Sequence, residues 1–346
     1  MKTIFIGSLG GGKTPNDGVS VKNFHIITKL QKYCKNLKVI DSQNWKKSPF
    51  ILFNILTTIF LNPKAKYILS LNNRSAYRLI NLIIRIVPKA EVIYWVIGGT
   101  LGKWILEGKV KASPYKKLKE IIVEGEQMMV ELTRSGFENA SVMPNFKSIP
   151  KIDISNCKHK DGKLKLVFLS RVTPEKGCDL IIEAASKLNQ EGYKDKYLID
   201  FYGPVKEDYN QTFLEKIKDL DNLNYHGFID LRDLDNYKKL SGYDAMLFPT
   251  YWHGEGFPGI IIDAYVCGLP ILASDWNMNK DFIIDGETGI IFKPKSSDEI
   301  IKAVKNCIEG KFDLKKMSLK TFETVKEYDI ETVLSEENLK RHHIID

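Results

Sequence analysis

The chain has 346 residues, of which 43% are hydrophobic and 27% charged, a composition that excludes a disordered or low-complexity protein. Its length suggests two α/β domains or one large domain. The net charge of +8 is unevenly distributed, since residues 1–150 carry 23 Lys and Arg against 9 Asp and Glu, and residues 151–346 carry 28 against 34. Such a basic half is typical of a protein that meets an anionic membrane, a phosphorylated acceptor or nucleic acid, but a solvated, lysine-rich surface explains it equally well.

The cysteines and the first residues indicate a cellular compartment. The five cysteines form no CxxC pair and are scattered over the chain, at Cys34, Cys157, Cys178, Cys267 and Cys307. An odd, dispersed set favours neither a disulfide framework nor a zinc site, so we expect a reducing cytoplasm. Residues 1–12 show a short strand pattern followed by glycines, which is not the pattern of a signal peptide.

Short apolar runs alternate with helical patterns, which predicts parallel sheets covered by helices. The first half contains predicted strands at residues 2–7, 37–41, 66–71, 91–98, 120–125 and 140–145. The second half contains predicted strands at residues 163–170, 197–203, 222–228, 243–249, 270–274 and 289–292. Residues 147–162 lack periodicity, so we interpret them as a linker between two doubly wound domains.

Two apolar segments of the first half raise the question of a membrane. Residues 49–61 are too short to cross a bilayer, for which about 20 residues are needed. Residues 77–88 place Arg78 and Arg85 among aliphatic side chains and fit an amphipathic helix on a membrane surface. A helix that packs on a sheet while its arginines extend to solvent is the favoured interpretation.

Residues 7–14 match the phosphate-loop pattern GxxxxGK[ST] and follow a predicted strand. That motif needs a helix that begins at Lys13, but the Pro-Asn-Asp-Gly run that follows favours a turn. The only acid that resembles a Walker B residue, Asp200, lies beyond the predicted linker. An NTPase is therefore the weaker interpretation. We expect that Gly11 and Gly12 let the backbone approach a ligand in a cleft between the domains, where Lys13 adds charge.

Residues 251–275 contain two carboxylates in a pattern that suits a nucleotide sugar. Glu255 lies in a Gly-rich loop, and Asp263 follows it by eight residues. With this spacing, one carboxylate can reach the sugar of a bound nucleotide while the other reaches its ribose hydroxyls.

The same segment predicts a helix that begins after Pro258. The first N–H groups of that helix, on Gly259, Ile260 and Ile261, would lie at the positive end of its dipole. A helix start of this kind is a suitable site for a diphosphate.

Residues 168–177 form a strand end and a loop that leads into a helix. Arg171 and Lys176 lie at the carboxyl edge of a parallel strand, where folds of this type bind ligands. Two cations there can neutralise a diphosphate and stabilise the charge that departs during sugar transfer.

These segments resemble the retaining GT-B glycosyltransferases of the large family that includes sucrose synthase and bacterial mannosyl- and capsule-polymer transferases. The resemblance covers most of residues 163–300 and rests on the runs SRVTPEKG, YHGF, EGFPGIIIDAYVCGLPILASD and DGETGIIF. The first half matches more loosely, in GGGKTPNDGVSVKN, VIGG and VMPN. The hallmark of that family is Glu-x7-Glu, and this chain has Glu255-x7-Asp263, with a second carboxylate that is one methylene shorter.

The resemblance implies a GT-B fold, in which two Rossmann-like domains face each other across a cleft. Residues 1–150 would form the acceptor-side domain and residues 163–325 the nucleotide-sugar-binding domain. The C-terminal helix within residues 326–346 would pack back on the first domain. We also expect the domains to close over the donor.

The resemblance also implies roles for individual residues. It assigns the donor diphosphate to Arg171 and Lys176, the hydroxyls of the transferred sugar to Glu255, and the ribose to Asp263. Three backbone amides add to the diphosphate site, those of Gly259, Ile260 and Ile261. The segments around Gly203 and His226-Gly227-Phe228 would line the base pocket.

One feature of the family is missing. Many relatives carry a histidine in the first domain near the donor sugar, whereas the comparable residues 96–100 read Val-Ile-Gly-Gly-Thr. The backbone of Gly98 and Gly99 is a candidate replacement. His253 precedes Glu255 by two residues and could face the pocket, although a lone histidine is more often a structural hydrogen-bonding group.

The predicted function is retaining transfer of a sugar from a nucleoside-diphosphate sugar to a saccharide acceptor. We expect this acceptor to be lipid-linked and the pathway to be the synthesis of a bacterial surface polysaccharide such as capsule or O-antigen. No DxD motif stands in a metal-binding context, so we expect no metal and no cofactor besides the donor. We also expect a cytoplasmic protein that contacts the anionic inner face of the plasma membrane and binds no nucleic acid. Three alternatives stay open, namely a non-catalytic sugar-nucleotide-binding or scaffold protein, the NTPase, and an epimerase on a related fold.

Overall fold

The computed structural model describes residues 1–12, 18–152 and 162–346. The predictions for Lys13, for most of the turn that follows it and for most of the linker therefore lie outside the described residues. Within them, no helix is both long enough and apolar enough to cross a membrane.

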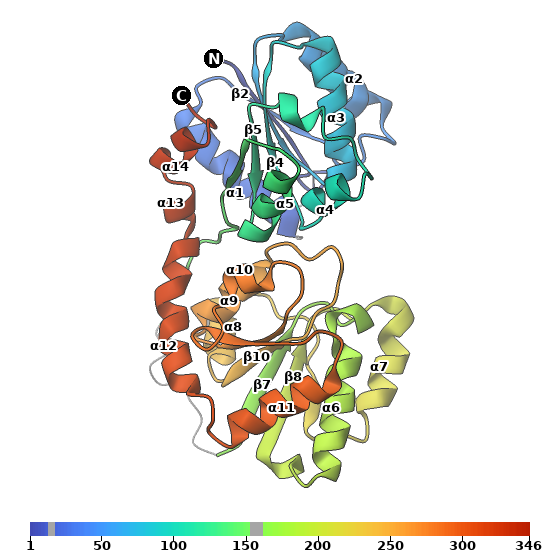
Figure 1. Ribbon diagram of the computed structural model, residues 1–346, viewed down its shortest axis with the longest axis vertical. Coiled ribbons are helices and arrows are strands. Elements are labelled where there is room, and N and C mark those ends of the chain that lie inside the picture. Colours follow the sequence, from blue (N-terminus) through green and yellow to red (C-terminus); the bar gives the residue numbers. More distant parts are fainter. Residues whose placement is uncertain (13–17, 153–161) are drawn as a thin grey trace. The chain divides into compact units, whose positions relative to one another are not determined.

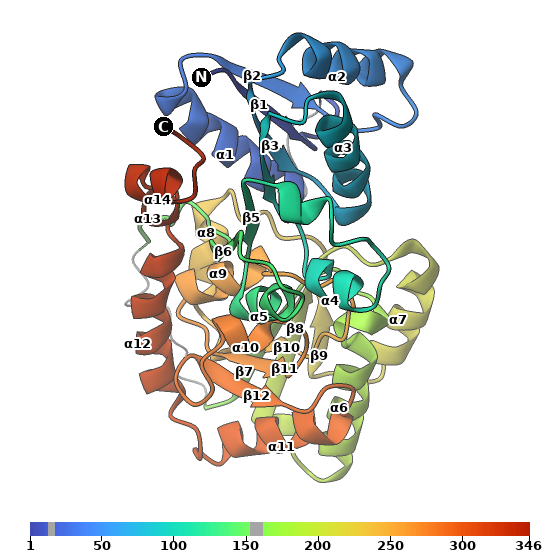
Figure 2. The ribbon, with the colours of Figure 1, turned by 45° about the horizontal axis from the view of Figure 1, so that its top comes forward.

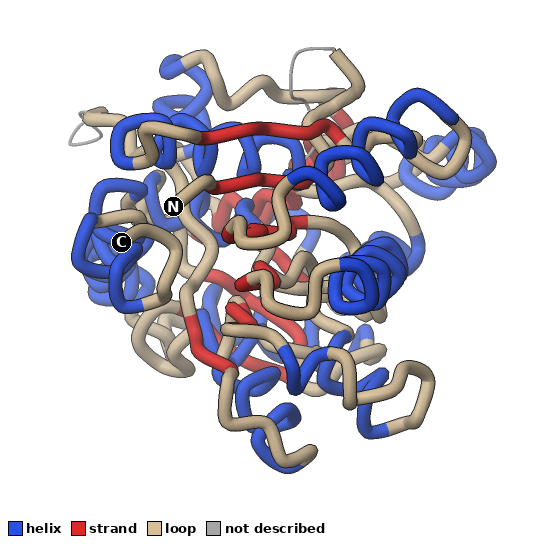
Figure 3. The backbone as a smooth tube through the Cα atoms, turned by 90° about the horizontal axis from the view of Figure 1, so that it is seen from above, coloured by secondary structure: helices blue, strands red, loops and turns tan. Residues whose placement is uncertain are grey.

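The chain divides into two compact units. Unit 1 consists of Met1–Lys147, Gly254–Pro258 and Ile330–Asp346, and unit 2 consists of Ser148–His253 and Gly259–Asp329. Each unit is an α/β structure in which the strands lie between helices (Figures 1 and 3).

The described part of unit 1 contains a six-stranded parallel sheet with the order β2-β1-β3-β4-β5-β6. Its strands are β1 (Thr3–Gly7), β2 (Leu37–Asp41), β3 (Lys66–Ser70), β4 (Glu91–Trp95), β5 (Glu120–Val123) and β6 (Ala140–Val142). Strands β1, β3 and β5 are completely buried. Because both faces of a parallel sheet are covered, such strands are apolar through their middle residues, and their polar side chains lie at the strand ends.

Helices cover both faces of this sheet. They are α1 (Gly18–Tyr33), α2 (Pro49–Leu61), α3 (Asn73–Ile86), α4 (Leu101–Leu106), η1 (Tyr115–Lys117), α5 (Glu126–Arg134), α13 (Ile330–Val333) and α14 (Glu336–Arg341). Figures 1 and 2 show α1 on one face of the central strands, and α2 beside α3 on the other. The start of α2 is fixed by Ser48 as its N-cap and by the proline that follows, and the start of α3 by the N-cap Asn72.

The last 17 residues of the chain complete unit 1. The backbone N–H of Ile330 donates to the carbonyl oxygen of Lys147 at 2.8 Å. Leu334 and Ile344 are fully buried in a core that also contains Trp95 of β4. The C-terminal segment therefore supplies part of the apolar cover that the sheet requires.

The described part of unit 2 contains a second six-stranded parallel sheet, with the order β12-β11-β10-β7-β8-β9. Its strands are β7 (Leu164–Leu169), β8 (Tyr197–Tyr202), β9 (Leu223–Tyr225), β10 (Ala245–Phe248), β11 (Ile271–Ser274) and β12 (Gly289–Phe292). Its helices are η2 (Pro174–Lys176), α6 (Cys178–Gln190), η3 (Lys194–Lys196), η4 (Glu207–Tyr209), α7 (Asn210–Ile217), α8 (Leu234–Leu240), α9 (Gly259–Val266), α10 (Asn279–Phe282), α11 (Ser297–Ile308), α12 (Leu314–Thr324) and η5 (Val325–Tyr328).

Every strand that the sequence predicted is present, and no end differs from its predicted position by more than three residues. Both sheets are parallel and doubly wound, so the predicted fold class is confirmed. In each sheet the order reverses beside the first strand, next to β1 in unit 1 and next to β7 in unit 2. Ligands of such folds bind beyond the carboxyl ends of the strands at this switch point.

Candidate functional site

The switch point of unit 2 brings together the two most informative segments of the sequence. Strand β10 pairs directly with β7. The loop after β7 carries Arg171 and Lys176, and the connection after β10 leads to the start of α9 at Gly259. The sequence places these segments about 80 residues apart, and the topology alone brings them to one edge.

Two backbone contacts join these loops. The N–H of Tyr251 donates to the carbonyl oxygen of Glu175 at 2.8 Å. Gly177 has a φ of +88°, and a Cβ at this position would lie 2.5 Å from the carbonyl oxygen of Pro249. The glycine is therefore required both by its left-handed backbone and by the closeness of the second loop.

The two predicted diphosphate-binding cations differ in exposure. Arg171 is exposed at the end of the loop nearest β7. Lys176 is only 7% exposed, and its Nζ lies 6.0 Å from the ring centroid of Phe248. Arg171 can therefore reach toward a ligand in solvent, while Lys176 is held against the end of β10.

Helix α9 begins at Gly259, as predicted, and the first residues Gly259 and Ile260 are half-buried while Ile261 is fully buried. The first N–H groups of any helix lack partners within it. The start of α9 therefore offers backbone donors at the end of the connection that contacts the loop of Lys176.

Asp263 lies one turn into α9 and is 1% exposed. Its Oδ1 accepts a hydrogen bond from the hydroxyl of Tyr237 at 2.7 Å. Burial and the neighbouring Asp263 raise the pKa of Tyr237 far above its usual value, so this hydroxyl stays protonated as a donor. Asp263 is thus held in a buried hydrogen bond, and its role toward the ribose remains a prediction.

The predicted base pocket combines a structural glycine with an exposed aromatic ring. Gly203 has a φ of +139°, and a Cβ there would collide with the carbonyl oxygen of Ser170. Its N–H donates to the carbonyl oxygen of Gly227 at 2.8 Å. Phe228, the next residue, is 71% exposed after β9. The close packing of three loops thus explains why a glycine is needed at position 203. The ring of Phe228 is exposed and available to a ligand.

A polar network beside these loops was not predicted. Asp200 on β8 accepts hydrogen bonds from Tyr243 at 2.5 Å and Asn224 at 2.9 Å, and its Oδ1 lies 3.1 Å from Nε2 of His226. The ring of His226 stacks on Tyr202, with centroids 4.9 Å apart. Asp200 therefore anchors the strand end that leads to Phe228. It is a structural group in unit 2 and not the Walker B acid of the NTPase hypothesis.

The loop that carries Glu255 belongs to unit 1 by its contacts. The N–H of Phe257 donates to Oε2 of Glu124 at 3.2 Å, and the carbonyl oxygen of Phe257 accepts from Asn145 at 3.0 Å. Oε1 of Glu124 accepts from Nζ of Lys22 at 2.5 Å, and both side chains are almost completely buried. Glu255 itself is 7% exposed, so its position follows from a well-packed loop.

The backbone of Gly98 also lies against this loop. A Cβ on Gly256 would lie 3.0 Å from Cα of Gly98, and Gly98 has a φ of +84°. Both glycines are needed for this close approach. The suggestion that Gly98 and Gly99 take the place of the missing histidine remains a prediction.

His253 is exposed, and its ring contacts Trp252 with centroids 4.5 Å apart. Its carbonyl oxygen accepts a hydrogen bond from the side chain of Asn277 at 3.2 Å. The hydrogen bond is made by the backbone, so a hydrogen-bonding role for the imidazole remains a prediction.

The glycine loop after β1 is bound to a carboxylate. Oδ1 of Asp41, at the end of β2, accepts from the N–H of Leu9 at 3.0 Å, and Oδ2 accepts from the N–H of Gly11 at 2.8 Å. Gly12 has a φ of +82°, and a Cβ there would meet no atom within 4 Å. Amides that would hold phosphate in an NTPase therefore already have an anionic partner, whereas the space beside Gly12 is open.

A cavity of about 310 Å³ opens at the switch point of unit 1. It is lined by residues that follow β1, β2 and β3, including Ser8, Gln43, Trp45, Asn72 and Ser75. Among the described residues, Nε1 of Trp45 is buried and has no hydrogen-bond partner. An aromatic ring beside hydroxyl and amide groups is a suitable surface for a saccharide.

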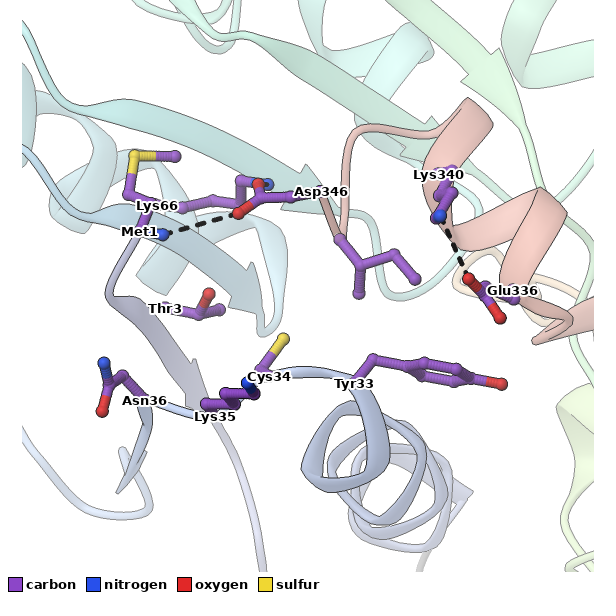
Figure 4. A pocket seen from close by; sticks show the side chains of 11 residues that line it. Met1, Thr3, Tyr33, Cys34, Lys35, Asn36, Lys66, Glu336, Lys340 and Asp346 are labelled. Carbon is purple, nitrogen blue, oxygen red and sulfur yellow. Dashed lines mark hydrogen bonds and ion pairs between the residues drawn. The ribbon is translucent and has the colours of Figure 1, made fainter.

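A second cavity of unit 1, of about 350 Å³, lies at the opposite ends of the strands (Figure 4). Its lining includes Thr3 and Lys66, the first residues of β1 and β3. An ion pair of 2.8 Å joins Lys66 to Asp346 there. Because ligands of these folds bind at the carboxyl ends of the strands, this cavity is not the predicted site.

Within residues 1–12, 18–152 and 162–346, no group of three or more His, Cys, Asp and Glu side chains is arranged to hold a metal ion. The prediction that the protein needs no metal remains a prediction.

Two doubly wound α/β units, each with polar loops at the switch point of its sheet, define a GT-B fold. Among solved structures, HepE of Anabaena in complex with UDP aligns over 99% of both chains, with a TM-score of 0.72 and 15% identity. The lipopolysaccharide outer core galactosyltransferase WaaB, without ligand, aligns over 99% of both chains, with a TM-score of 0.74 and 15% identity. At this identity the likeness concerns the fold.

The chain belongs to the family of glycosyl transferases group 1, whose model matches residues 151–323. It is 28% identical over 150 residues to the 2-deoxystreptamine N-acetyl-D-glucosaminyltransferase of Niallia circulans, which is 42% of this chain and 37% of that protein. It is 24% identical over 196 residues to the poly(ribitol-phosphate) α-N-acetylglucosaminyltransferase of Staphylococcus aureus, which is 55% of this chain and 38% of that protein. The matches thus span little more than a third of the length of these relatives.

Proposed function

We propose that the protein is a retaining glycosyltransferase that moves a sugar from a nucleoside-diphosphate sugar to a saccharide acceptor. The observation that carries this proposal is the contact, at the switch point of unit 2, between the loop with Arg171 and Lys176 and the connection that leads from β10 to α9. The membership of residues 151–323 in the glycosyl transferases group 1 family supports it. So does the binding of UDP by HepE, which has the same fold.

In the proposed reaction, Arg171, Lys176 and the first amides of α9 hold the donor diphosphate. The bond between the anomeric carbon and a diphosphate oxygen breaks, and a bond to the acceptor oxygen forms on the same face of the sugar. The acceptor's proton passes to an oxygen of the departing diphosphate. Glu255 positions the sugar through its hydroxyls, and Asp263 is the proposed partner of the ribose. The two cations take the place of a divalent metal in stabilising the leaving charge.

We place the acceptor in the cavity beside Trp45 in unit 1. Its position at the carboxyl ends of β1, β2 and β3 is where such a sheet binds ligands. The acceptor that we propose is lipid-linked, and the pathway is the synthesis of a bacterial surface polysaccharide. The similarity to the poly(ribitol-phosphate) transferase and to a protein of the Klebsiella pneumoniae cps region supports this pathway. The protein would then work at the cytoplasmic face of the membrane.

The test is the release of nucleoside diphosphate from UDP-, GDP-, ADP- and TDP-sugars by the wild type, by Arg171→Ala and by Glu255→Ala. We expect slow hydrolysis of one donor, strongly reduced in both variants. Arg232→Ala is the matched control, because Arg232 is an exposed arginine of unit 2 that pairs with Asp230. Release that is equal in all four proteins would contradict the assignment of the site.

A non-catalytic sugar-nucleotide-binding protein is the second candidate. Two sequence features favour it, the missing histidine at residues 96–100 and the shorter second carboxylate at Asp263. Thermal stabilisation by a nucleotide sugar without release of nucleoside diphosphate, in the presence of lipid-linked acceptors, would support this candidate over the enzyme.

A further inference from the structure

Helix α2 exposes an unusually apolar face. Its 13 residues contain no charged side chain. The most exposed of them are Phe50, Phe53, Phe60 and Leu61, with exposed fractions of 87%, 68%, 75% and 74%. These positions are separated by three, seven and one residues, so they share one side of the helix.

The opposite side of α2 packs on the sheet. Ile55 and Ile59 are completely buried and Thr58 is 2% exposed. The hydroxyl of Tyr67 on β3 donates to the carbonyl oxygen of Asn62 at 2.9 Å, which fixes the end of the helix. The exposed face is therefore held in place by a rigid support and is not a consequence of a loosely attached helix.

A helix that is apolar on all sides is normally buried, and an exposed apolar patch of aromatic residues usually marks an interaction surface. At about 1.5 Å per residue, α2 is about 20 Å long, shorter than the bilayer core of about 30 Å. The geometry thus suits a helix that lies in a membrane surface and not one that crosses it.

The charge around this face identifies its partner. Residues 42–90 contain eight Lys and Arg and no Asp or Glu. Lys46 and Lys47 precede Ser48, the N-cap of α2. Arg74 and Arg78 lie one turn apart on the exposed side of the neighbouring helix α3, which Figures 1 and 2 show next to α2.

Lys46, Arg74 and Arg78 lie near enough for their charges to repel one another. Burial, followed by the charges of Arg78 and Arg74, lowers the pKa of Lys46. Among the described residues, none of the three forms an ion pair with a carboxylate. An anionic surface would relieve this repulsion, and lipid phosphates supply negative charge at the depth where aromatic side chains enter the interface.

The sequence pointed to residues 77–88 as the amphipathic segment. In the structure, Leu79, Ile80 and Ile83 are completely buried, so α3 packs on the sheet through its apolar side. This agrees with the favoured interpretation of that segment. Helix α3 contributes arginines to the surface, and α2 contributes the exposed apolar side chains.

We propose that α2 docks the protein on an anionic lipid bilayer, with Phe50, Phe53, Phe60 and Leu61 inserted at the interface and Lys46, Lys47, Arg74 and Arg78 against lipid phosphates. The saccharide cavity opens beside the start of this helix, since Trp45, Lys46 and Lys47 also line it. A lipid-linked acceptor anchored in the bilayer would then present its saccharide next to α2. In this respect the inference deepens the proposed function, although docking itself does not depend on transfer.

The experiment is flotation of the full chain with vesicles of phosphatidylcholine alone and of phosphatidylcholine mixed with phosphatidylglycerol. We expect the wild type to float with the mixed vesicles and much less with the neutral ones. F53S/F60S should reduce the bound fraction about tenfold, because it removes two inserted rings. R74E/R78E should remove the preference for the anionic vesicles. L234S/L319S, which changes two exposed leucines of unit 2, is the matched control and should float like the wild type.

Equal flotation of F53S/F60S and the wild type, or no flotation of the wild type, would overturn the proposal. A wild type that does not float but dimerises in solution, with a monomeric F53S/F60S, would assign the face to a second copy of the chain. Release of nucleoside diphosphate in detergent separates this inference from the proposed function. Flotation without release, in the presence of a lipid-linked acceptor, would leave the docking surface and remove the transferase. Release without flotation would leave the transferase and remove the docking surface.

Discussion

The N–H of Phe257 donates to Oε2 of Glu124, and this 3.2 Å hydrogen bond ties the loop of Glu255 to a buried ion pair. The other oxygen of Glu124 is paired with Lys22, 102 residues earlier in the chain. Glu124 is only 5% exposed, and each of its carboxylate oxygens has a hydrogen-bond donor in place of water. We infer that Glu124 is a positioning residue for the proposed sugar-binding loop.

Glu124→Gln should destabilise the protein by about 3–5 kcal/mol, because Lys22 is left buried without its carboxylate. It should also lower donor turnover, since the Phe257 N–H loses a charged acceptor. Urea unfolding and release of nucleoside diphosphate measure the two effects. Asp221→Asn breaks an exposed pair with Lys194 and should leave both unchanged. A Glu124→Gln protein of unchanged stability would show that the ion pair does not support this loop.

Asp41→Ala should loosen the glycine loop after β1, because the N–H groups of Leu9 and Gly11 lose their shared acceptor. The expected loss in the free energy of unfolding is about 1–3 kcal/mol. Asp41→Asn keeps one carbonyl oxygen as an acceptor and should therefore lose less stability than Asp41→Ala. Chemical denaturation of the three proteins gives the ranking, and equal stability of wild type and Asp41→Ala would contradict it. If the loop were a phosphate loop, Asp41→Ala would instead increase nucleoside-triphosphate binding.

The fold could be predicted from the sequence because a covered parallel sheet leaves a simple signal, a short apolar run at each strand. The start of α9 was predictable for a similar local reason, since Pro258 and Gly259 favour the first turn of a helix. The contacts that hold the candidate site could not be predicted. Lys22 looks like a surface lysine of a helix, and only the tertiary fold places it against Glu124.

The exposed face of α2 was also beyond sequence reasoning. An apolar run of 13 residues predicts burial on all sides. The helix follows β2, which is the edge strand of its sheet, and the buried side of α2 is therefore limited to positions such as Ile55 and Ile59. The hydrogen bond between Tyr237 and Asp263 is a second case, since it joins side chains 26 residues apart and leaves no local signal in the sequence.

Gly203→Ala tests whether this glycine serves packing. A Cβ would meet the carbonyl oxygen of Ser170, and the φ of +139° is strained for alanine, so the loss of stability should exceed about 1–3 kcal/mol. Gly192→Ala is the matched control, because Gly192 has a φ of +85° and open space around it. The Gly192→Ala substitution should lower the free energy of unfolding by about 1 kcal/mol. If Gly203→Ala and Gly192→Ala lower the stability equally in thermal unfolding, the loops after β7 and β8 can move apart to accommodate the added Cβ at low cost.

Buried tyrosines should make the protein sensitive to alkali. Burial raises the pKa of Tyr67 and of Tyr197 to about 12. In the unfolded chain these hydroxyls lose their protons near pH ~10. The unfolded state then binds fewer protons than the folded state, so stability is complete below about pH 10 and falls between about pH 10 and 12. Tyr67→Phe should reduce the slope of unfolding free energy against pH in this window, and an unchanged slope would exclude Tyr67 as a contributor.

Tyr237→Phe separates the structural role of Asp263 from its proposed role toward the donor. Removing the hydroxyl leaves a buried carboxylate without one donor, so stability should fall by about 1–3 kcal/mol. If Asp263 also binds the ribose, it gains an available oxygen, and the KM for the donor should not rise although the protein is less stable. Asp263→Asn should instead raise that KM and leave kcat nearly unchanged, because the ribose is bound alike in the ground and transition states. A donor KM that is unchanged in Asp263→Asn would restrict this residue to its hydrogen bond with Tyr237.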